Sequence, residues 1–244
     1  MNAAAEVEVT AAELAALRRL STATVTMQLL KRGLRACFMT GVRPLDPGNC
    51  RFAAEAYTLR FVPMREDLSR PEVLGDPEYA PRKAIEDIPA GQALVIDCRG
   101  HQGAGSIGDI LALRLHKRGI AAAVADGPVR DAAAVRETGL AVFCSGAAAP
   151  ASLNVHFGAD LQRPIACGGV TVFPGDVLVG DGDGVVVVPR ALAGEIAADG
   201  AEQERLEMFL KQRIADGHPT IGTYPPNAQT LAAYEAWCSE QEAR

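Results

Sequence analysis

The sequence lacks any apolar run close to the roughly 18 residues that a membrane-spanning helix requires. Its N-terminus is acidic and has no basic segment followed by an apolar core, so it does not resemble a secretory signal. From these two absences we expect a cytoplasmic chain that has no membrane partner.

Basic residues are fewer than acidic residues. The chain has 24 Lys and Arg against 30 Asp and Glu, which gives a formal net charge of −6. Binding to a nucleic-acid backbone needs clustered Lys and Arg, so we expect no nucleic-acid partner.

The six cysteines are widely scattered and include no C-x-x-C pair. They indicate reduced thiols and not a disulfide framework or a zinc site.

Helix and strand signals mark the N-terminal region. Thr10 and Glu13 form a T-x-x-E capping box before an apolar run, which predicts a helix that begins there. Residues 21–33 predict a second helix, and residues 51–63 alternate as a strand does. A proline-rich connection around a short helix follows.

The middle of the chain has a clearer pattern, in which short apolar strands alternate with helices. Consecutive strand–helix–strand units predict a parallel, buried sheet with right-handed connections. The strands are expected over residues 93–97, 120–126 and 140–146, and the helices over 109–119 and 132–139.

The C-terminal part changes character. Residues 164–189 are β-rich with glycine turns, and helices are expected over 191–216 and 228–241. We expect one mixed α/β domain over residues 1–244, with a core of about 15–205 and a helical extension of about 206–244.

Two glycine-rich motifs suggest ligand binding at first sight. "GAGSIG" (103–108) matches G-x-G-x-x-G, but five residues separate it from the preceding strand, and too little of a doubly wound sheet follows for a dinucleotide fold. A backbone nest that holds a small carboxylate or phosphate is the better interpretation, and a tightly packed turn without a ligand competes with it. "GDGDG" (180–184) lacks the further ligands of a calcium loop and indicates an acidic hairpin turn.

Other common catalytic groups are missing. The histidines show no metal-ligand spacing, no serine lies in a G-x-S-x-G frame, and the lysines fall in helical, exposed stretches. Schiff-base chemistry needs a lysine whose pKa is lowered by burial. None of these lysines lies in an apolar strand, so that chemistry is not expected here.

The stretch "DGPVRD" (126–131) is the strongest candidate for a site. Arg130 and Asp131 follow one strand, and Asp109 begins the helix that follows the previous strand. Carboxyl ends of adjacent parallel strands meet at one edge of a sheet, so Gly108 and Asp109 should lie near Arg130 and Asp131. This set could hold a divalent metal and an oxyanion together, or it could be a structural Arg–Asp pair that caps a helix.

Asp109, twenty intervening residues, and Arg130-Asp131 resemble the D-x20-R-D motif of the RraA-like proteins. That family includes divalent-metal-dependent 4-hydroxy-4-methyl-2-oxoglutarate/4-carboxy-4-hydroxy-2-oxoadipate aldolases and RraA regulators of ribonuclease E. "GIAAAVADGPVRD" and "PIACGGVTVFPGDVLVGDGDGVVVVP" are similar to two further blocks of the family. The resemblance covers roughly residues 88–205 and, more weakly, 15–66.

The resemblance implies a β/β/α swivelling-type fold in homotrimers or homohexamers, with sites at subunit boundaries. It implies that Asp131 binds Mg²⁺ or Mn²⁺ and that Arg130 stabilises the enolate of a pyruvate moiety. Asp109 would orient water at the metal. The pyruvate carboxylate would be held by the backbone amides around Gly108, Asp109, Ile110 and Leu111. The implied activity is cleavage of a 4-hydroxy-2-oxo acid to pyruvate, with oxaloacetate decarboxylation through the same enolate.

One position departs from the aldolases of this family, because Met27 stands where they carry a Glu that serves a neighbouring subunit. Glu204 could supply a carboxylate across the interface instead, although a solvated helix face is the alternative for its segment. Two other functions remain open. One is a dehydratase or hydrolase of 2-keto-3-deoxy sugar acids, and the other is a non-catalytic regulator of ribonuclease E.

Overall fold

The computed structural model describes residues 8–242, which divide into two compact units, one up to Ala197 and one from Ala198 onward. The expected helices and strands are present, with small shifts at their ends. Whether the whole chain forms one domain stays a prediction. The first unit contains α1 (Ala11–Leu17), α2 (Thr22–Lys31), β1 (Arg43–Pro44), β2 (Phe52–Pro63), η1 (Pro71–Gly75), α3 (Ala80–Asp87), β3 (Ala93–Asp97), α4 (Asp109–Lys117), β4 (Ala122–Ala125), α5 (Ala132–Glu137), β5 (Ala141–Cys144), η2 (Ser152–Asn154), β6 (His156–Leu161), β7 (Ile165–Cys167), β8 (Val170–Val172), β9 (Val177–Asp181), β10 (Gly184–Val188), η3 (Arg190–Leu192) and the start of α6 (Ala193–Ala215).

Strand β2 joins the two halves of an eight-stranded sheet. It pairs antiparallel with β9 near its beginning, parallel with β3 in its middle and antiparallel with β6 at its end. The strand order is β1-β5-β4-β3-β2-β9-β10, with β6 beside β2. A bridge between Phe38 and Val186 and a hydrogen bond from Arg43 Nη1 to the Asp183 carbonyl (2.7 Å) connect the two ends. The sheet is therefore a nearly closed barrel in a mixed α/β fold.

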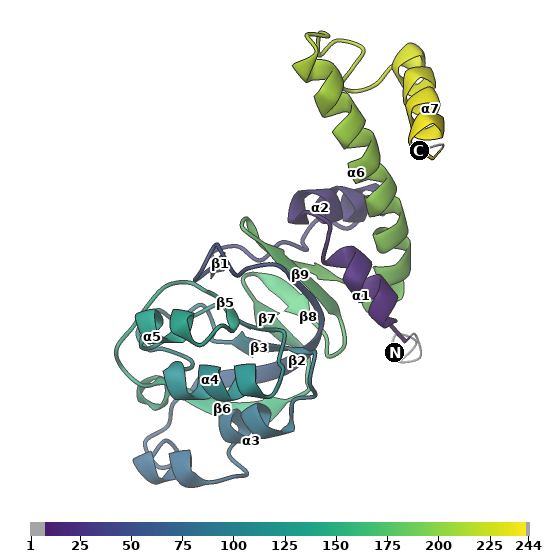
Figure 1. Ribbon diagram of the computed structural model, residues 1–244. Coiled ribbons are helices and arrows are strands. Elements are labelled where there is room, and N and C mark those ends of the chain that lie inside the picture. Colours follow the sequence, from purple (N-terminus) through teal and green to yellow (C-terminus); the bar gives the residue numbers. More distant parts are fainter. Residues whose placement is uncertain (1–7, 243–244) are drawn as a thin grey trace. The chain divides into compact units, whose positions relative to one another are not determined.

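The expected parallel arrangement of β3, β4 and β5 is confirmed. Helices α3, α4 and α5 lie side by side over one face of these strands (Figure 1). Leu94 and Ile96 of β3 pack against that helical layer, which includes Leu115 of α4, whereas Val95 faces the opposite core. Both faces of β3 are buried, which explains its continuous apolar sequence.

Helices α1 and α2 cover β9 and β10. Leu17 and Val25 are fully buried against Val179 and Val186. The capping box at the start of α1 is present as expected, since Glu13 N donates to Thr10 Oγ1 and Thr10 N donates to Glu13 Oε2.

The acidic turn "GDGDG" has a structural role, as the sequence indicated. Asp181 is buried and accepts hydrogen bonds from Thr22 N and Thr22 Oγ1, both 2.8 Å. It also accepts from Asp183 N at 2.9 Å. The carboxylate therefore fixes the first turn of α2 to the end of β9.

The second unit consists of the rest of α6 together with α7 (Ala228–Glu242). Phe209, Tyr234 and Trp237 form an aromatic cluster, with ring centroids 5.5–6.0 Å apart. Among the described residues, none of the helices combines the length and apolar character needed to cross a bilayer.

Candidate active site

The N-terminal end of α4 presents backbone N–H groups that the helix itself cannot use. Gly108 is the N-cap and offers no side chain to cap them. Asp109 Oδ1 accepts from Ile110 N at 2.8 Å, while the N–H groups of Asp109 and Leu111 have no acceptor within the helix. Because these dipoles align, the end of α4 is suited to a small anion such as a carboxylate.

The loop before α4 is held against the segment that follows β4. Ser106 N and Oγ both donate to the Pro128 carbonyl, at 2.8 and 3.0 Å, and Arg130 N donates to the Ile107 carbonyl at 2.8 Å. These hydrogen bonds occupy polar groups of the loop, which are then not available to a ligand. The ligand-binding capacity of "GAGSIG" therefore lies in its last residue and the helix that follows.

Glycines allow the two segments to approach closely. A Cβ at Gly105 would collide with Arg130 and would lie 2.8 Å from the Val129 carbonyl carbon. A Cβ at Gly108 would lie 3.1 Å from Asp131 Oδ2. The structure thus brings Gly108, Arg130 and Asp131 together, as the topology of the parallel strands predicted.

Asp131 has a left-handed backbone conformation, with φ of 52°. Asp tolerates this region better than most residues, yet it costs of the order of 1 kcal/mol. The side chain of Asp131 is exposed and makes no capping hydrogen bond to α5. The unusual backbone therefore presents a carboxylate beside the free end of α4.

Arg130 and Asp131 do not form the structural pair that was the alternative interpretation. Within residues 8–242 no ion pair of Arg130 is found, and its buried Nε atom has no hydrogen-bond partner. A buried donor without a partner is costly, so its retention needs an explanation. An oxyanion bound between Arg130 and the end of α4 supplies one.

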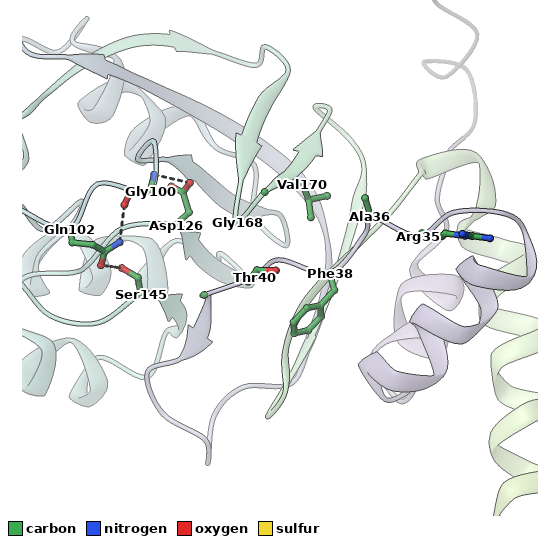
Figure 2. A pocket seen from close by; sticks show the side chains of 12 residues that line it. Arg35, Ala36, Phe38, Thr40, Gly100, Gln102, Asp126, Ser145, Gly168 and Val170 are labelled. Carbon is green, nitrogen blue, oxygen red and sulfur yellow. Dashed lines mark hydrogen bonds between the residues drawn. The ribbon is translucent and has the colours of Figure 1, made fainter.

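A cavity of about 630 Å³ is lined in part by residues that follow β3, β4 and β5, among them Gln102, Asp126 and Ser145 (Figure 2). Its polar groups bond to one another: Ser145 Oγ donates to Gln102 Oε1, and Gln102 Nε2 donates to the Gly100 carbonyl. Asp126 accepts from Cys98 N and Gly100 N, and burial raises the pKa of its carboxyl group. Neither Arg130 nor Asp131 lines this cavity, so it is not the predicted site.

Two other titratable groups, His156 and Lys83, have structural surroundings. His156 is fully buried and stacks on Phe61. Burial lowers the pKa of His156 to about 4, and the charge of Arg99 adds to this effect. Lys83 forms ion pairs with Glu78 and Asp87, which raise the pKa of its ammonium group. A lysine of this kind is unsuited to Schiff-base chemistry, as the sequence indicated.

Two further residues were singled out in the sequence, Met27 at the position of the aldolase Glu and Glu204 as a possible cross-subunit carboxylate. Met27 is an exposed residue of α2. Glu204 lies on α6 in the second unit. A role of Glu204 in the site of a neighbouring subunit stays a prediction.

A metal ion at this site would depend on few protein ligands. Among the described residues, no group of three or more His, Cys, Asp or Glu side chains is placed to hold a metal. Mg²⁺ is commonly bound by one or two carboxylates, with water and substrate oxygens completing its shell. The exposed carboxylate of Asp131, beside Gly108, fits that mode and does not fit an all-protein cage.

Comparison with known proteins agrees with this fold. The model of the RraA-like family, described as Aldolase/RraA, matches residues 21–187. The chain belongs to this family. A protein of Halalkalibacterium halodurans with a provisional 4-hydroxy-4-methyl-2-oxoglutarate aldolase name is 31% identical over 163 residues, which are 67% of this chain and 72% of that protein.

Two further relatives are described differently, one as an aldolase and one as a member of an RNase inhibitor family. The 4-hydroxy-4-methyl-2-oxoglutarate aldolase of Thermus thermophilus is 31% identical over 147 residues, covering 60% of this chain and 81% of that enzyme. The solved structure of RraAS2 from Streptomyces coelicolor is described as an unusual member of the RNase ES inhibitor RraA protein family. It is 35% identical, covers 84% of this chain and 100% of its own, and has a TM-score of 0.76.

Proposed function

We propose that this chain is a divalent-metal-dependent lyase that cleaves a 4-hydroxy-2-oxo acid by a retro-aldol reaction and releases pyruvate. The observation that supports this most strongly is the arrangement of Arg130 and Asp131. Both lie beside the N-terminal end of α4, and within the described residues Arg130 Nε has no hydrogen-bond partner and the Asp131 side chain does not cap α5. The names of the aldolase relatives point to the same reaction class.

Asp131 is the residue that would hold Mg²⁺ or Mn²⁺, and Asp109 would orient water at the metal. When bound, such an ion acts as a Lewis acid toward the 2-oxo group of the substrate. The N–H groups of Asp109 and Leu111 would bind the substrate carboxylate, which fixes the orientation of the adjacent carbonyl.

Arg130 would supply a fixed positive charge where the enolate oxygen develops as the C3–C4 bond breaks. The planar guanidinium presents its N–H donors in a fixed fork that suits an oxyanion. Loss of CO₂ from oxaloacetate forms the same enolate, and we therefore propose that decarboxylation accompanies the aldolase reaction.

Assembly belongs to the same proposal. A homotrimer or homohexamer would place the site at a boundary between subunits, where Glu204 of one copy could serve the site of another. This would also explain why the site is an exposed surface in the isolated chain. If Glu204 serves the site of another copy, Glu204→Gln lowers activity while the oligomer stays intact.

A regulatory function is a second candidate, because the similar RraAS2 is described as belonging to an RNase inhibitor family. A regulator of this kind needs only a surface that binds its partner. A regulatory function therefore does not explain why Arg130 and Asp131 form no ion pair with each other. Inhibition of RNase E cleavage by wild type and by Asp131→Ala alike would favour this alternative.

The test is pyruvate release, coupled to lactate dehydrogenase. Oxaloacetate and 4-hydroxy-4-methyl-2-oxoglutarate are supplied with Mg²⁺ or Mn²⁺, and separately with EDTA. The proposal predicts metal-dependent turnover that Arg130→Ala and Asp131→Ala each abolish. Full activity in either variant would contradict the assigned site.

A further inference from the structure

A pocket of about 300 Å³ lies at the opposite end of β4 from the candidate active site. Ala121, which precedes β4, lines the pocket, whereas Arg130 and Asp131 follow the strand. Helix α4 shows the same separation, because Asp109 begins it and His116, near its last residue, lines the pocket. At 1.5 Å per residue these two positions are about 10 Å apart along the helix axis. The pocket is therefore separate from the end of α4 that would hold a substrate carboxylate.

The ionisable side chains that line this pocket are all basic. They belong to Arg18, Arg51 and His116, and no carboxylate is among the lining residues. The sequence as a whole has more acidic than basic residues, so this composition stands apart from the rest of the chain. Because arginine is always charged, the pocket wall carries two full positive charges and no negative one.

Arg18 and Arg51 are held next to each other by backbone carbonyls. Arg18 Nε donates to the Arg51 carbonyl at 3.2 Å, and Arg51 Nη1 donates to the Arg19 carbonyl at 3.3 Å. A guanidinium has five N–H donors, so each of these bonds uses a small part of them. Within residues 8–242 neither guanidinium forms an ion pair. Both groups therefore have donors available to an anion.

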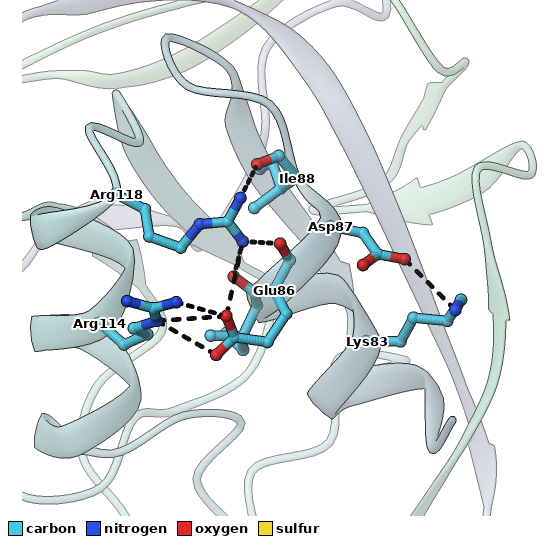
Figure 3. Close-up of polar contacts among 7 residues, drawn as sticks. Lys83, Glu86, Asp87, Ile88, Arg114 and Arg118 are labelled. Carbon is cyan, nitrogen blue, oxygen red and sulfur yellow. Dashed lines mark hydrogen bonds and ion pairs between the residues drawn. The ribbon is translucent and has the colours of Figure 1, made fainter. Parts of the chain in front are cut away.

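Two other cations of α4 and its C-cap are bound to structural partners. Arg114 pairs with Glu86 at 2.6 Å (Figure 3). Arg118 Nη2 donates to the Ile88 carbonyl at 3.1 Å (Figure 3). These contacts connect α4 to α3. The two arginines of the pocket have no partner of opposite charge in the part of the chain that the structure describes.

Backbone carbonyls in the turns after α4 and α5 already accept hydrogen bonds. The Gly119 carbonyl accepts from Gly91 N at 2.8 Å, and the Gly139 carbonyl accepts from Asn49 Nδ2 at 2.8 Å. His116 lies close to Gly139, since a Cβ at that glycine would be 3.1 Å from the His116 Cε1 atom. The groups left to contact an anion are the two guanidiniums and the imidazole.

We propose that this pocket binds a phosphate dianion, either as the free ion or as the phosphate group of a small monoester. Two arginines match its charge, and each can donate two parallel hydrogen bonds to phosphate oxygens. The buried side chains of Phe52, Ile120 and Leu140 also line the pocket and would contact the short carbon chain of a monoester. The volume is at the lower end of the range for small-molecule sites, which fits a ligand of this size.

The experiment is a calorimetric titration of the full-length protein in a metal-free buffer that contains no phosphate. Inorganic phosphate and glycerol 3-phosphate are separate titrants, which distinguishes a site for the free ion from a site for a monoester. We expect one site per chain, with a Kd of about 1 mM or lower for at least one titrant. Arg18→Gln/Arg51→Gln should weaken binding of that titrant by about tenfold or more, because charge-assisted hydrogen bonds are lost.

A matched double variant, Arg70→Gln/Arg163→Gln, removes two exposed arginines that do not line the pocket and changes the net charge equally. It should bind as wild type does, and so should Arg130→Gln. The single variants Arg18→Gln and Arg51→Gln, each checked for a thermal transition, keep the test valid if their double variant does not fold.

Absence of binding of both titrants to wild type would overturn the inference. Equal weakening by the two double variants would also overturn it, because the effect would then come from net charge alone. Loss of binding in Arg130→Gln would place the anion at the end of α4 and would contradict the assignment to this pocket.

Discussion

At the scale of single residues, Gly105 decides whether Arg130 can occupy its place. Its Cα lies so close to Arg130 and Val129 that any Cβ must displace one of them. We predict that Gly105→Ala destabilises the protein by about 1–3 kcal/mol, as overpacking typically does. It should also lower kcat/KM, because the guanidinium moves.

Gly182→Ala is the matched control for that variant. Nothing lies within 4 Å of a Cβ at Gly182, and its backbone is outside the left-handed region. Thermal unfolding and pyruvate release together make the comparison. Similar results for the two alanine variants would contradict the close packing at Gly105.

The buried imidazole of His156 predicts a loss of stability in mild acid. Its pKa in the folded protein is about 4, below the ordinary value of 6.5, because burial and then the charges of Arg99 and His101 oppose protonation. Between these values the unfolded chain binds more protons than the folded one, so stability falls as pH falls. From neutral pH to about pH 5 this amounts to about 2 kcal/mol.

Urea unfolding at the two pH values measures this effect, with His156→Phe as the comparison. Phe stacks on Phe61 as the imidazole does and has no proton to gain. The variant should lose stability less steeply over the same pH range. An unchanged slope would show that other groups control the acid sensitivity.

At the scale of elements, the carboxylate of Asp181 connects α2 to β9. Thr22 donates to it through both its N–H and its hydroxyl, and the group is buried. We predict that Asp181→Asn destabilises the fold by about 1.5–3 kcal/mol, the value of hydrogen bonds to a charged group. Asp183→Asn changes an exposed carboxylate in the same turn and should have almost no effect on the unfolding midpoint.

The elements themselves could be predicted where their signals are local. Strands β3, β4 and β5 and the helices between them follow from apolar runs, glycine stops and caps, and their order implies a parallel sheet. The three different partners of β2 could not be predicted, because antiparallel pairing with distant β6 and β9 leaves no local pattern. The near closure of the sheet was missed for the same reason.

The candidate site also has a part that could be predicted from the sequence and a part that could not. The meeting of Gly108 with Asp131 follows from parallel topology, and the resemblance to a known motif identified the chemistry expected of it. A cavity of about 540 Å³, lined by the segment after η1, by α3 and by Leu111, was not predicted, because residues 64–79 are irregular and proline-rich and have no period to place them.

At the scale of the whole molecule, the two units have separate cores. The three apolar clusters of the first unit contain no residue beyond Ala197, while the second unit has its own cluster around Phe209 and Tyr234. We predict that a chain ending at residue 200 still unfolds in one cooperative thermal transition. A chain that shows no transition would mean that the barrel depends on the second unit.

The central claim is that Arg130, Asp131 and the end of α4 form one site for a metal-chelated 2-oxo acid. Calorimetric binding of oxalate, a mimic of the pyruvate enolate, tests it most directly, with and without Mg²⁺. We predict binding that requires Mg²⁺ and that weakens by about tenfold or more in both Arg130→Lys and Asp131→Asn. Oxalate binding that is independent of Mg²⁺, or unchanged in either variant, would contradict the account.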